Sequence, residues 1–337
     1  MARVGTAITI GILLAGVAAA PAPAQSVADF YRGKTVNVLI GVGVGGEYDL
    51  QARLVARHLG KHIPGNPIVV PQNMTGAGGI NMANYLFAQA AKDGTYIGML
   101  GNNFPATQAV GGNGVRFDSV KFNWLGTMAP VVETMAVLAS TGVKTVDDLR
   151  AKEIVAGASG KGAITYIYPS MMNEYLGTKF KIVTGYPGGN QINLAMERAE
   201  VQARNNTWSS WKATKPSWVR DKFINVIVQA GPRAPDLDAP SVEELAKTPD
   251  ERKLIELVTS GTHLGRPMAT TPDVPQDRLK ALRDAYRATM ADPEFRAESE
   301  KAGFEVAPVY GEDMQKIVER IMSTPKELAS RAKHLVE

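Results

Sequence analysis

The sequence contains no cysteine, which excludes disulfide bonds, thiolate metal ligands and cysteine nucleophiles. An excess of one charge is also missing, since 37 basic residues stand against 33 acidic ones and the basic residues are scattered. A net charge of +4 without a basic cluster gives no support to a nucleic-acid partner. Low-complexity stretches and long charge runs are absent as well, which indicates a folded, globular chain.

Long apolar runs are absent apart from one near the start of the chain. Arg3 precedes an apolar run at residues 8–20, and Ala22-Pro23-Ala24 supplies the small residues of a cleavage site. This layout is typical of a secretory signal peptide, and the run is shorter than the roughly 20 residues of a bilayer-spanning helix. We therefore expect residues 1–24 to be a signal peptide, cleavage after Ala24, and a periplasmic mature protein.

Strand and helix patterns alternate along the rest of the chain. In the first part, strand patterns at 35–40, 68–70 and 96–100 are separated by helical patterns at 49–61 and 80–91. The second part has strand patterns at 131–139, 154–158, 180–183 and 224–229 with helices from 145, 165 and 191, and helices at 275–290, 293–302 and 311–323 follow. This alternation predicts an α/β fold with mainly parallel sheets. Because single cores stop growing at roughly 250–300 residues, the 337 residues predict two domains.

Four Gly-rich turns each follow a predicted strand and precede a predicted helix, at residues 41–46, 75–79, 159–162 and 187–190. Backbone N–H groups at a helix N-terminus, together with the helix dipole, favour a bound anion. Glycine is also common in ordinary strand-to-helix connections, so one such turn carries little weight. Four of them, two in each half, predict a shared anion-binding cleft.

Two nucleotide-binding motifs are matched only in part. The turn at 41–46 fits the spacing G-x-G-x-x-G, but no acidic residue follows the strand at 68–70, which argues against a dinucleotide. The turn at 159–162 fails as a phosphate-binding loop because Val155 stands where that motif requires glycine. We therefore expect no cofactor.

Residues for catalysis or metal binding are sparse. His58 and His62 lie one helical turn apart, but no third ligand is evident, and a solvated helix face accounts for both. No Gly-x-Ser-x-Gly elbow accompanies the serines. The sequence therefore predicts neither a metal site nor an enzyme.

Several side chains at the turns have both a structural and a ligand-binding interpretation. Asp49 could cap the following helix, and Tyr48 and Tyr186 could pack at a domain edge or stack on a ligand. Arg204 ends a strand pattern beside polar residues, where it could grip a carboxylate or form a structural salt bridge. Together with Trp208, the two tyrosines suggest an aromatic carboxylate.

These features resemble the Bug-type, or TctC-like, solute-binding proteins of tripartite tricarboxylate transporters. The similarity lies in a Gly-Gly loop that ends in Asp49, an asparagine-led G-A-G-G loop within residues 72–79, and a Lys-Asp-Gly-Thr-Tyr segment at 92–96. It continues through the segments at 157–159 and 186–189 and covers nearly all of the mature chain.

The resemblance implies a type II periplasmic-binding-protein fold with two α/β lobes joined by crossing hinge strands. The first lobe is expected to contain residues 25–128 and 263–337, and the second residues 129–262. The implied function is the capture of a small organic acid by a monomeric receptor that delivers it to a tripartite tricarboxylate-type permease. A binding protein that feeds a sensor receptor and an exported enzyme on the same scaffold are the alternatives.

The resemblance also implies which loops bind the ligand. The first two loops would hold a carboxylate through backbone amides, and the second-lobe loops would face its distal end. The expected residues are Gly45, Gly46, Glu47, Tyr48, Asp49, Thr75, Gly76, Ala77, Gly78, Asn102, Ser159, Gly160, Gly162, Tyr186, Gly188, Arg204 and Trp208. Glu47 and Tyr48 replace the family's Ser-Thr pair, and a carboxylate there is unfavourable unless Glu47 points outward or pairs with a cation such as Arg204.

Overall fold

The computed structural model describes residues 25–336 and the first two residues of the chain. The expected signal peptide, apart from those two residues, and its cleavage site lie outside the described part. Among the described residues, no helix is both long and apolar enough to span a bilayer.

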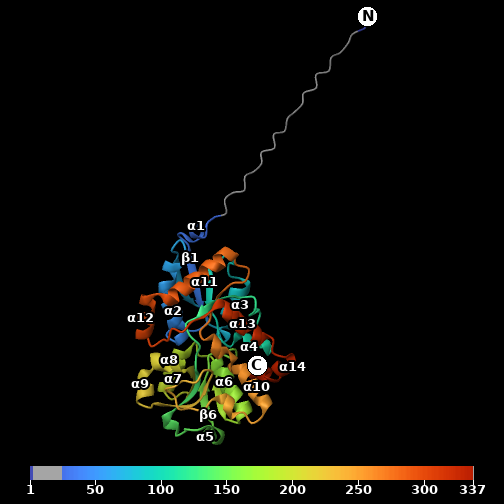
Figure 1. Cartoon of the computed structure of the whole chain (residues 1–337). Helices are drawn as coiled ribbons and strands as arrows, with labels where there is room; N and C mark the ends of the chain where they lie inside the picture. Colours follow the sequence, from blue (N-terminus) through green and yellow to red (C-terminus); the bar gives the residue numbers. More distant parts are fainter. Residues whose placement is uncertain (3–24, 337) are drawn as a thin grey trace.

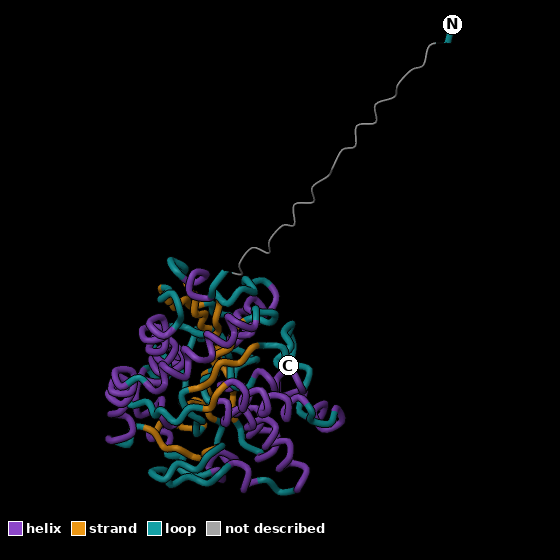
Figure 2. Tube along the Cα trace, turned by 45° about the horizontal axis from the view of Figure 1, so that its top comes forward, coloured by secondary structure: helices purple, strands orange, loops and turns teal. Residues whose placement is uncertain are grey.

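Two β-sheets flanked by helices form two lobes, stacked along the long axis of the molecule (Figure 1). Strands occupy the interior and helices pack around them (Figure 2). The α/β architecture expected from the sequence is therefore confirmed.

The first sheet has the strand order β11-β4-β10-β3-β1-β2. Its strands are β1 (Thr35–Ile40), β2 (Ile68–Asn73), β3 (Tyr96–Met99), β4 (Asn123–Thr127), β10 (Met268–Thr270) and β11 (Val309–Tyr310). β1 pairs in parallel with β2 and β3, whereas β10 runs antiparallel between β3 and β4. Val36, Val38 and Ile40 belong to one core cluster and Leu39 to another, so β1 is buried on both faces, which explains its unbroken apolar run.

The helices of the first lobe cover this sheet on both sides. They are α1 (Val27–Tyr31), α2 (Glu47–Leu59), α3 (Ile80–Ala88), α4 (Phe104–Ala109), α11 (Gln276–Ala291), α12 (Pro293–Lys301) and α13 (Gly311–Met322). α2 and α3 pack on β1, and α11 and α13 pack on β4. Both α2 and α3 begin at the carboxyl end of a parallel strand, where Gly-rich turns connect strand to helix.

The second sheet has the order β7-β6-β8-β5-β9. Its strands are β5 (Glu133–Leu138), β6 (Ile154–Gly157), β7 (Phe180–Val183), β8 (Ala203–Thr207) and β9 (Ile224–Ala230), and its helices are α5 (Val146–Ala151), α6 (Ile164–Met171), α7 (Gly189–Glu197), α8 (Trp208–Thr214), α9 (Pro216–Arg220) and α10 (Pro249–Thr259). β6 pairs in parallel with β7 and β8, and β5 is antiparallel to β8 and β9. Both sheets are thus mixed: β10 and β11 run against the other four strands of the first sheet, and β5 runs against the other four of the second.

Two segments cross side by side between the lobes, at residues 127–133 and 262–268. The Val131 amide donates to the Thr262 carbonyl over 2.9 Å, and the Arg266 amide donates to Thr127 Oγ1 over 2.9 Å. Gly265 has a φ of +63°, and a side chain there would meet the Ala129 carbonyl. Only glycine therefore fits where the two crossing segments approach.

The end of the chain lies against the second lobe. α14 (Lys326–Arg331) packs on α10, and the short 3-10 turn at Lys333–Val336 packs on α6. Leu335 and Val336 are buried in the same apolar cluster as residues of α6 and α10. The C-terminus consequently sits beside the boundary between the lobes (Figure 1).

Some elements differ from their sequence patterns. α2 begins at Glu47, two residues before the expected start, with Gly46 as its N-cap, so Asp49 lies inside the helix. The helix expected from residue 165 ends at Met171 and continues as a π-helical turn over Met172–Leu176. Short strands such as β4, β10 and β11 were not expected, because two to five residues are too few to show a period.

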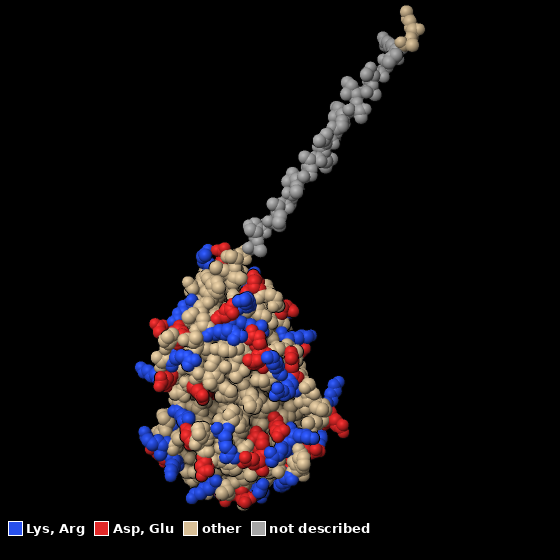
Figure 3. Space-filling view, viewed as in Figure 1, with Lys and Arg blue, Asp and Glu red and all other residues tan. Residues whose placement is uncertain are grey.

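Charged side chains of both signs are interspersed over the face shown in Figure 3. Several exposed ion pairs of the described residues join side chains three or four positions apart, such as Lys280 with Asp284 at 2.6 Å. On this face, neither lobe presents a patch of one sign.

Candidate functional site

A cavity of about 70 Å³ lies between the lobes. Its walls are Gly41, Val42, Gly46, Glu47, Tyr48, Gly78, Gly79, Met82, Met99, Gly101, Asn103 and Phe104 from the first lobe, Ser159, Ala163, Ile164, Thr165, Gly188, Gly189, Arg204, Asn205 and Asn206 from the second, and Arg266 from a crossing segment. Since a buried water needs roughly 10–15 Å³, the space suits a small organic ligand.

The structure brings seven of the seventeen expected ligand-binding residues together around this cavity. They are Gly46, Glu47, Tyr48, Gly78, Ser159, Gly188 and Arg204. The other ten lie outside the cavity lining: Gly45, Asp49, Thr75, Gly76, Ala77, Asn102, Gly160, Gly162, Tyr186 and Trp208.

Four helices of eight or more residues begin at the cavity without a side-chain cap. Their N-cap residues are Gly46 for α2, Gly79 for α3, Ala163 for α6 and Gly188 for α7, and none accepts a hydrogen bond with its side chain. Elsewhere the helix starts are of both kinds: α5, α8, α10 and α12 begin with a Thr or Asp side chain that accepts from the first-turn backbone, whereas α11 and α13 have no side-chain cap. The cavity therefore collects first-turn N–H groups and the positive ends of four helix dipoles, an arrangement that favours an anion.

Arg204 is the one buried cation of the second-lobe wall, and it makes no ion pair among the described residues. Its guanidinium donates to the Gly189 carbonyl, to Asn193 Oδ1 and to Asn206 Oδ1, and it stacks over the Trp211 ring at 5.4 Å. Burial lowers the pKa of Arg204 to about 9, so the side chain is still protonated at neutral pH. A cation beside the positive end of α7 is unfavourable by itself, and a bound anion would relieve it.

The cation that pairs with Glu47 is Arg266, not Arg204. Arg266 lies on a crossing segment, and its Nε and Nη2 donate to Glu47 Oε2 over 2.9 and 2.7 Å. Its Nη1 is 3.4 Å from Glu133 Oε1, and its guanidinium covers the Tyr48 ring at 4.2 Å. Burial disfavours the charge of Arg266, but the carboxylate of Glu47, then Tyr48 and Glu133, raise its pKa above the ordinary value.

Glu47 also ties the first lobe to the second. Thr207 Oγ1 donates to Glu47 Oε2, and Ser209 Oγ donates to Glu47 Oε1 over 2.6 Å. Gln51 donates to the same Oε1 over 3.2 Å. Every oxygen of this buried carboxylate is therefore already used by the protein, which resolves how an acidic residue is tolerated in the loop.

Three of the remaining expected residues, Gly45, Asp49 and Asn102, form hydrogen bonds within the protein. Asp49 accepts from the Gly45 amide over 2.9 Å and from Arg53 and Asn73, and these partners hold its pKa below the ordinary value against the effect of burial. Asn102 supports Tyr48 from behind through two 3.2 Å hydrogen bonds.

The expected aromatic residues are spread apart. Trp208 donates from Nε1 to Asp236 and belongs to an apolar cluster of the second lobe, and Tyr186 packs at the edge of that cluster. Tyr48 is the only one of the three that lines the cavity.

The Gly-rich turns also form the contact between the lobes. The Gly43 amide donates to the Pro187 carbonyl over 2.9 Å, and backbone atoms of Gly78 and Gly160 lie against each other. A Cβ placed on Gly160 would be 2.7 Å from the Gly78 nitrogen, closer than real Cβ atoms come to backbone. Glycine at these positions therefore lets the lobes meet, which adds a second role to the anion-binding one expected from the sequence.

Replacing Gly160 by alanine is expected to open the cleft. The residue has no positive φ, so alanine suits its own backbone, and the only clash is with the opposite lobe. We expect a larger radius of gyration by small-angle X-ray scattering. Gly46→Ala is the matched control, because its nearest contact across the cleft would be an ordinary 3.7 Å. Equal radii for both variants and the unmodified protein would contradict this role.

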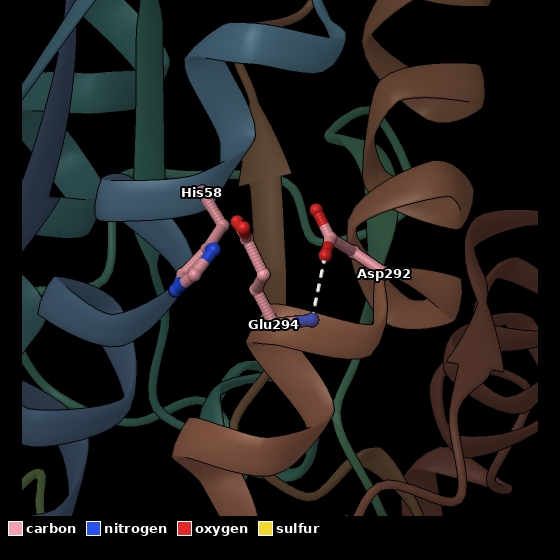
Figure 4. Close-up of side chains that lie close together, drawn as sticks. All are labelled: His58, Asp292 and Glu294. Carbon is pink, nitrogen blue, oxygen red and sulfur yellow. Dashed lines mark hydrogen bonds between the residues drawn. The ribbon is translucent and has the colours of Figure 1, made fainter.

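His58 gains possible metal-ligand neighbours that the sequence does not place beside it. Ligand atoms of His58, Asp292 and Glu294 lie within 4.8 Å of one another (Figure 4). Asp292 is the N-cap of α12, and Glu294 lies in the first turn of that helix. Lys61 Nζ is 2.6 Å from Asp292 and 2.7 Å from Glu294, and His58 Nε2 is 2.7 Å from Glu298. A cation of the chain thus already occupies the cluster, which acts as an ion-pair network joining α2 to α12.

The sequence analysis did not identify four residues of the site. Arg266, Asn205 and Asn206 line the cavity, and Glu133 supports it through its ion pair with Arg266. The only available signal for Arg266 was the presence of Glu47 in an anion-binding loop, since such a carboxylate requires a cation nearby. Asn205 and Asn206 follow Arg204 on β8, and all three residues line the cavity.

Comparison with known proteins relates both the fold and the sequence to receptors. The model of the family described as "Tripartite tricarboxylate transporter family receptor" (TctC) matches residues 51–331. A UPF0065 protein of Cupriavidus necator, from the gbd 5′ region, is 26% identical over 332 residues, which cover 94% of this chain and 90% of the relative.

Solved structures share the fold at low identity. The periplasmic binding protein BugD superposes with a TM-score of 0.73 at 20% identity, covering 90% of this chain and 98% of BugD. An R. palustris protein solved with adipate has a TM-score of 0.69 at 19% identity, covering 89% and 97%. These similarities confirm the two-lobed periplasmic-binding-protein fold.

Proposed function

The chain belongs to the tripartite tricarboxylate transporter receptor (TctC) family and is a solute-binding protein rather than an enzyme; on this premise, we propose that it captures a small organic acid in the interlobe cavity. The observation that carries the proposal is the set of four uncapped helix N-termini around that cavity, together with the unpaired Arg204. Both features stabilise a carboxylate and neither stabilises a cation.

We propose that the carboxylate accepts hydrogen bonds from first-turn amides of α2, α3, α6 or α7 and from Arg204. The expected residues that line the cavity, Gly46, Glu47, Tyr48, Gly78, Ser159, Gly188 and Arg204, are the proposed contacts. For Glu47 the contact is through its backbone, because its side chain is already saturated.

The proposed setting is the periplasm, where a monomeric receptor would deliver its ligand to a tripartite tricarboxylate-type permease. The family's description and the similarity to a periplasmic binding protein support this setting. A binding protein that feeds a sensor receptor is the alternative. Capture of permease subunits from solubilised membranes by the ligand-loaded protein supports transport, whereas capture of a signalling receptor supports sensing.

We further propose that the lobes divide at residues 128/129 and 262/263, with the crossing segments as the hinge. The strand membership of the two sheets supports this division, since β10 and β11 return to the first sheet. The last segment, α14 and the turn after it, then rests on the second lobe and bridges the two.

A thermal-shift screen of organic acids tests the proposed function. A ligand at 100 times its dissociation constant adds about 2.7 kcal/mol to the free energy of unfolding, which corresponds to roughly 5 °C in Tm for a chain of this size. We expect such a shift with at least one small carboxylate. The amide of the same acid is the control, because it keeps the shape and removes the charge. Stabilisation by amides or amines with no response to any carboxylate would contradict the proposal.

A further inference from the structure

Strand β8 carries three buried hydrogen-bonding atoms that have no partner in the described part of the chain. They are Arg204 Nε, Asn205 Oδ1 and Asn206 Nδ2, and all three residues line the interlobe cavity. Buried polar atoms of native proteins are nearly always satisfied, and leaving one unpaired is costly. Three on consecutive residues of one cavity wall therefore point to a ligand that completes them.

The network around these residues fixes which atom each amide leaves open. Asn205 donates from Nδ2 to the Thr134 carbonyl over 3.2 Å, so turning its amide would set two oxygens against each other. Asn206 Oδ1 accepts from Arg204 Nη2 over 2.9 Å, so its Nδ2 must face elsewhere. The wall consequently offers two unused donors, on Arg204 and Asn206, and one unused acceptor, on Asn205.

The two donors match a carboxylate, since one of them belongs to a guanidinium without an acidic partner. The acceptor requires a group that donates. A buried ammonium needs a free carboxylate. Glu47, the acidic side chain of the cavity wall, is fully used by Gln51, Ser209, Thr207 and Arg266. Glu133 Oε2 has no partner among the described residues, but Glu133 does not line the cavity. A neutral donor is therefore the better match.

We propose that the cavity selects a small carboxylate that also carries a neutral hydrogen-bond donor, a hydroxyl or a carboxamide, with Arg204 and Asn206 holding the carboxylate and Asn205 accepting from the donor. This assignment rests on the proposed function of the same site. The cavity volume of about 70 Å³ limits the ligand to a short chain.

Matched analogues test the assignment by isothermal titration calorimetry on the mature protein. Both enantiomers of lactate are compared with propionate and alanine, and both enantiomers of malate with succinate and aspartate. Within each set only the substituent differs: a hydroxyl, a hydrogen or an ammonium. We expect the hydroxy acid to bind about tenfold or more tightly than the unsubstituted acid, because the latter leaves Asn205 Oδ1 unpaired.

The outcomes separate this inference from the proposed function. Equal affinities for hydroxy and unsubstituted acids overturn the inference and leave a carboxylate receptor standing. If alanine or aspartate binds most tightly, the ligand carries an ammonium, and the proposal of a neutral hydrogen-bond donor is overturned. Failure of every acid in both sets, with stabilisation by uncharged solutes, overturns the proposed function together with the inference.

Two substitutions on β8 give an internal comparison. Asn205→Leu removes the acceptor, so we expect hydroxy acids and unsubstituted acids to bind this variant with about equal affinity. Asn206→Leu removes a donor to the carboxylate, so all acids are expected to weaken alike while the preference remains. Circular dichroism establishes that each variant is folded, and the analogue comparison on the unmodified protein decides the question if one is not.

Discussion

Replacing Arg266 by methionine is expected to lower the free energy of unfolding by about 3–5 kcal/mol, the cost of leaving buried charges without their partner. Glu47 and Arg266 are each 3% exposed and Glu133 is fully buried, so water cannot take over the role of the guanidinium. Burial already raises the pKa of Glu133 even with Arg266 beside it. Urea denaturation followed by circular dichroism measures the change.

The loss should come from the stranded carboxylates rather than from lost packing, because methionine fills similar apolar volume. Adding Glu47→Gln and Glu133→Gln to the Arg266→Met variant should therefore recover more than half of the lost stability. Lys280→Met is the matched control, since its ion pair with Asp284 is exposed and removal should change stability by less than about 1 kcal/mol. An Arg266→Met variant as stable as this control would contradict the buried network.

The Arg266 network shows which kind of information the sequence withholds. Glu47, Glu133 and Arg266 come from a helix start, a strand start and a crossing segment, and no local pattern connects them. The sequence did reveal that Glu47 needed a cation, but the choice among cations depends on which segments the fold brings together. Arg204, the candidate named from the sequence, instead lies against the start of α7.

Long, regular elements were predictable because burial imposes a period on their residues. The strand pattern at 35–40 coincides with β1, and the helix pattern from residue 145 coincides with α5, which begins after the N-cap Thr145. The segment around Arg204 was less clear because β8 reads Ala-Arg-Asn-Asn-Thr, which lacks apolar alternation. A central strand can be this polar where its side chains face a binding cavity instead of a core.

Replacing Arg204 by methionine is expected to weaken binding of the stabilising carboxylate by about 30-fold to several thousand-fold. Truncating one member of a buried, hydrogen-bonded charge pair costs 2–5 kcal/mol, and 1.4 kcal/mol corresponds to a factor of ten. Calorimetric titration with the best acid from the thermal-shift screen measures the change. Arg204→Lys should retain part of the affinity, because it keeps the charge and loses the planar arrangement of donors.

Arg220→Met is the control for net charge, since Arg220 pairs with Asp221 on the surface, away from the cavity. This variant should bind the same acid with unchanged affinity. If Arg204→Met also binds the acid as the unmodified protein does, Arg204 does not hold the carboxylate, and the backbone amides of the four helices must account for all of the affinity.

Without ligand, Arg204→Met should lose less than about 2 kcal/mol of stability, well below the loss for Arg266→Met. Arg204 is buried without a carboxylate and next to the positive end of α7, so its charge costs free energy in the empty protein and offsets much of what its hydrogen bonds contribute. Arg266 is equally buried, but two carboxylates of the protein already balance it. The two stability measurements therefore distinguish the two arginines. Arg266 stabilises the fold, whereas the charge of Arg204 is compensated only when an anion binds.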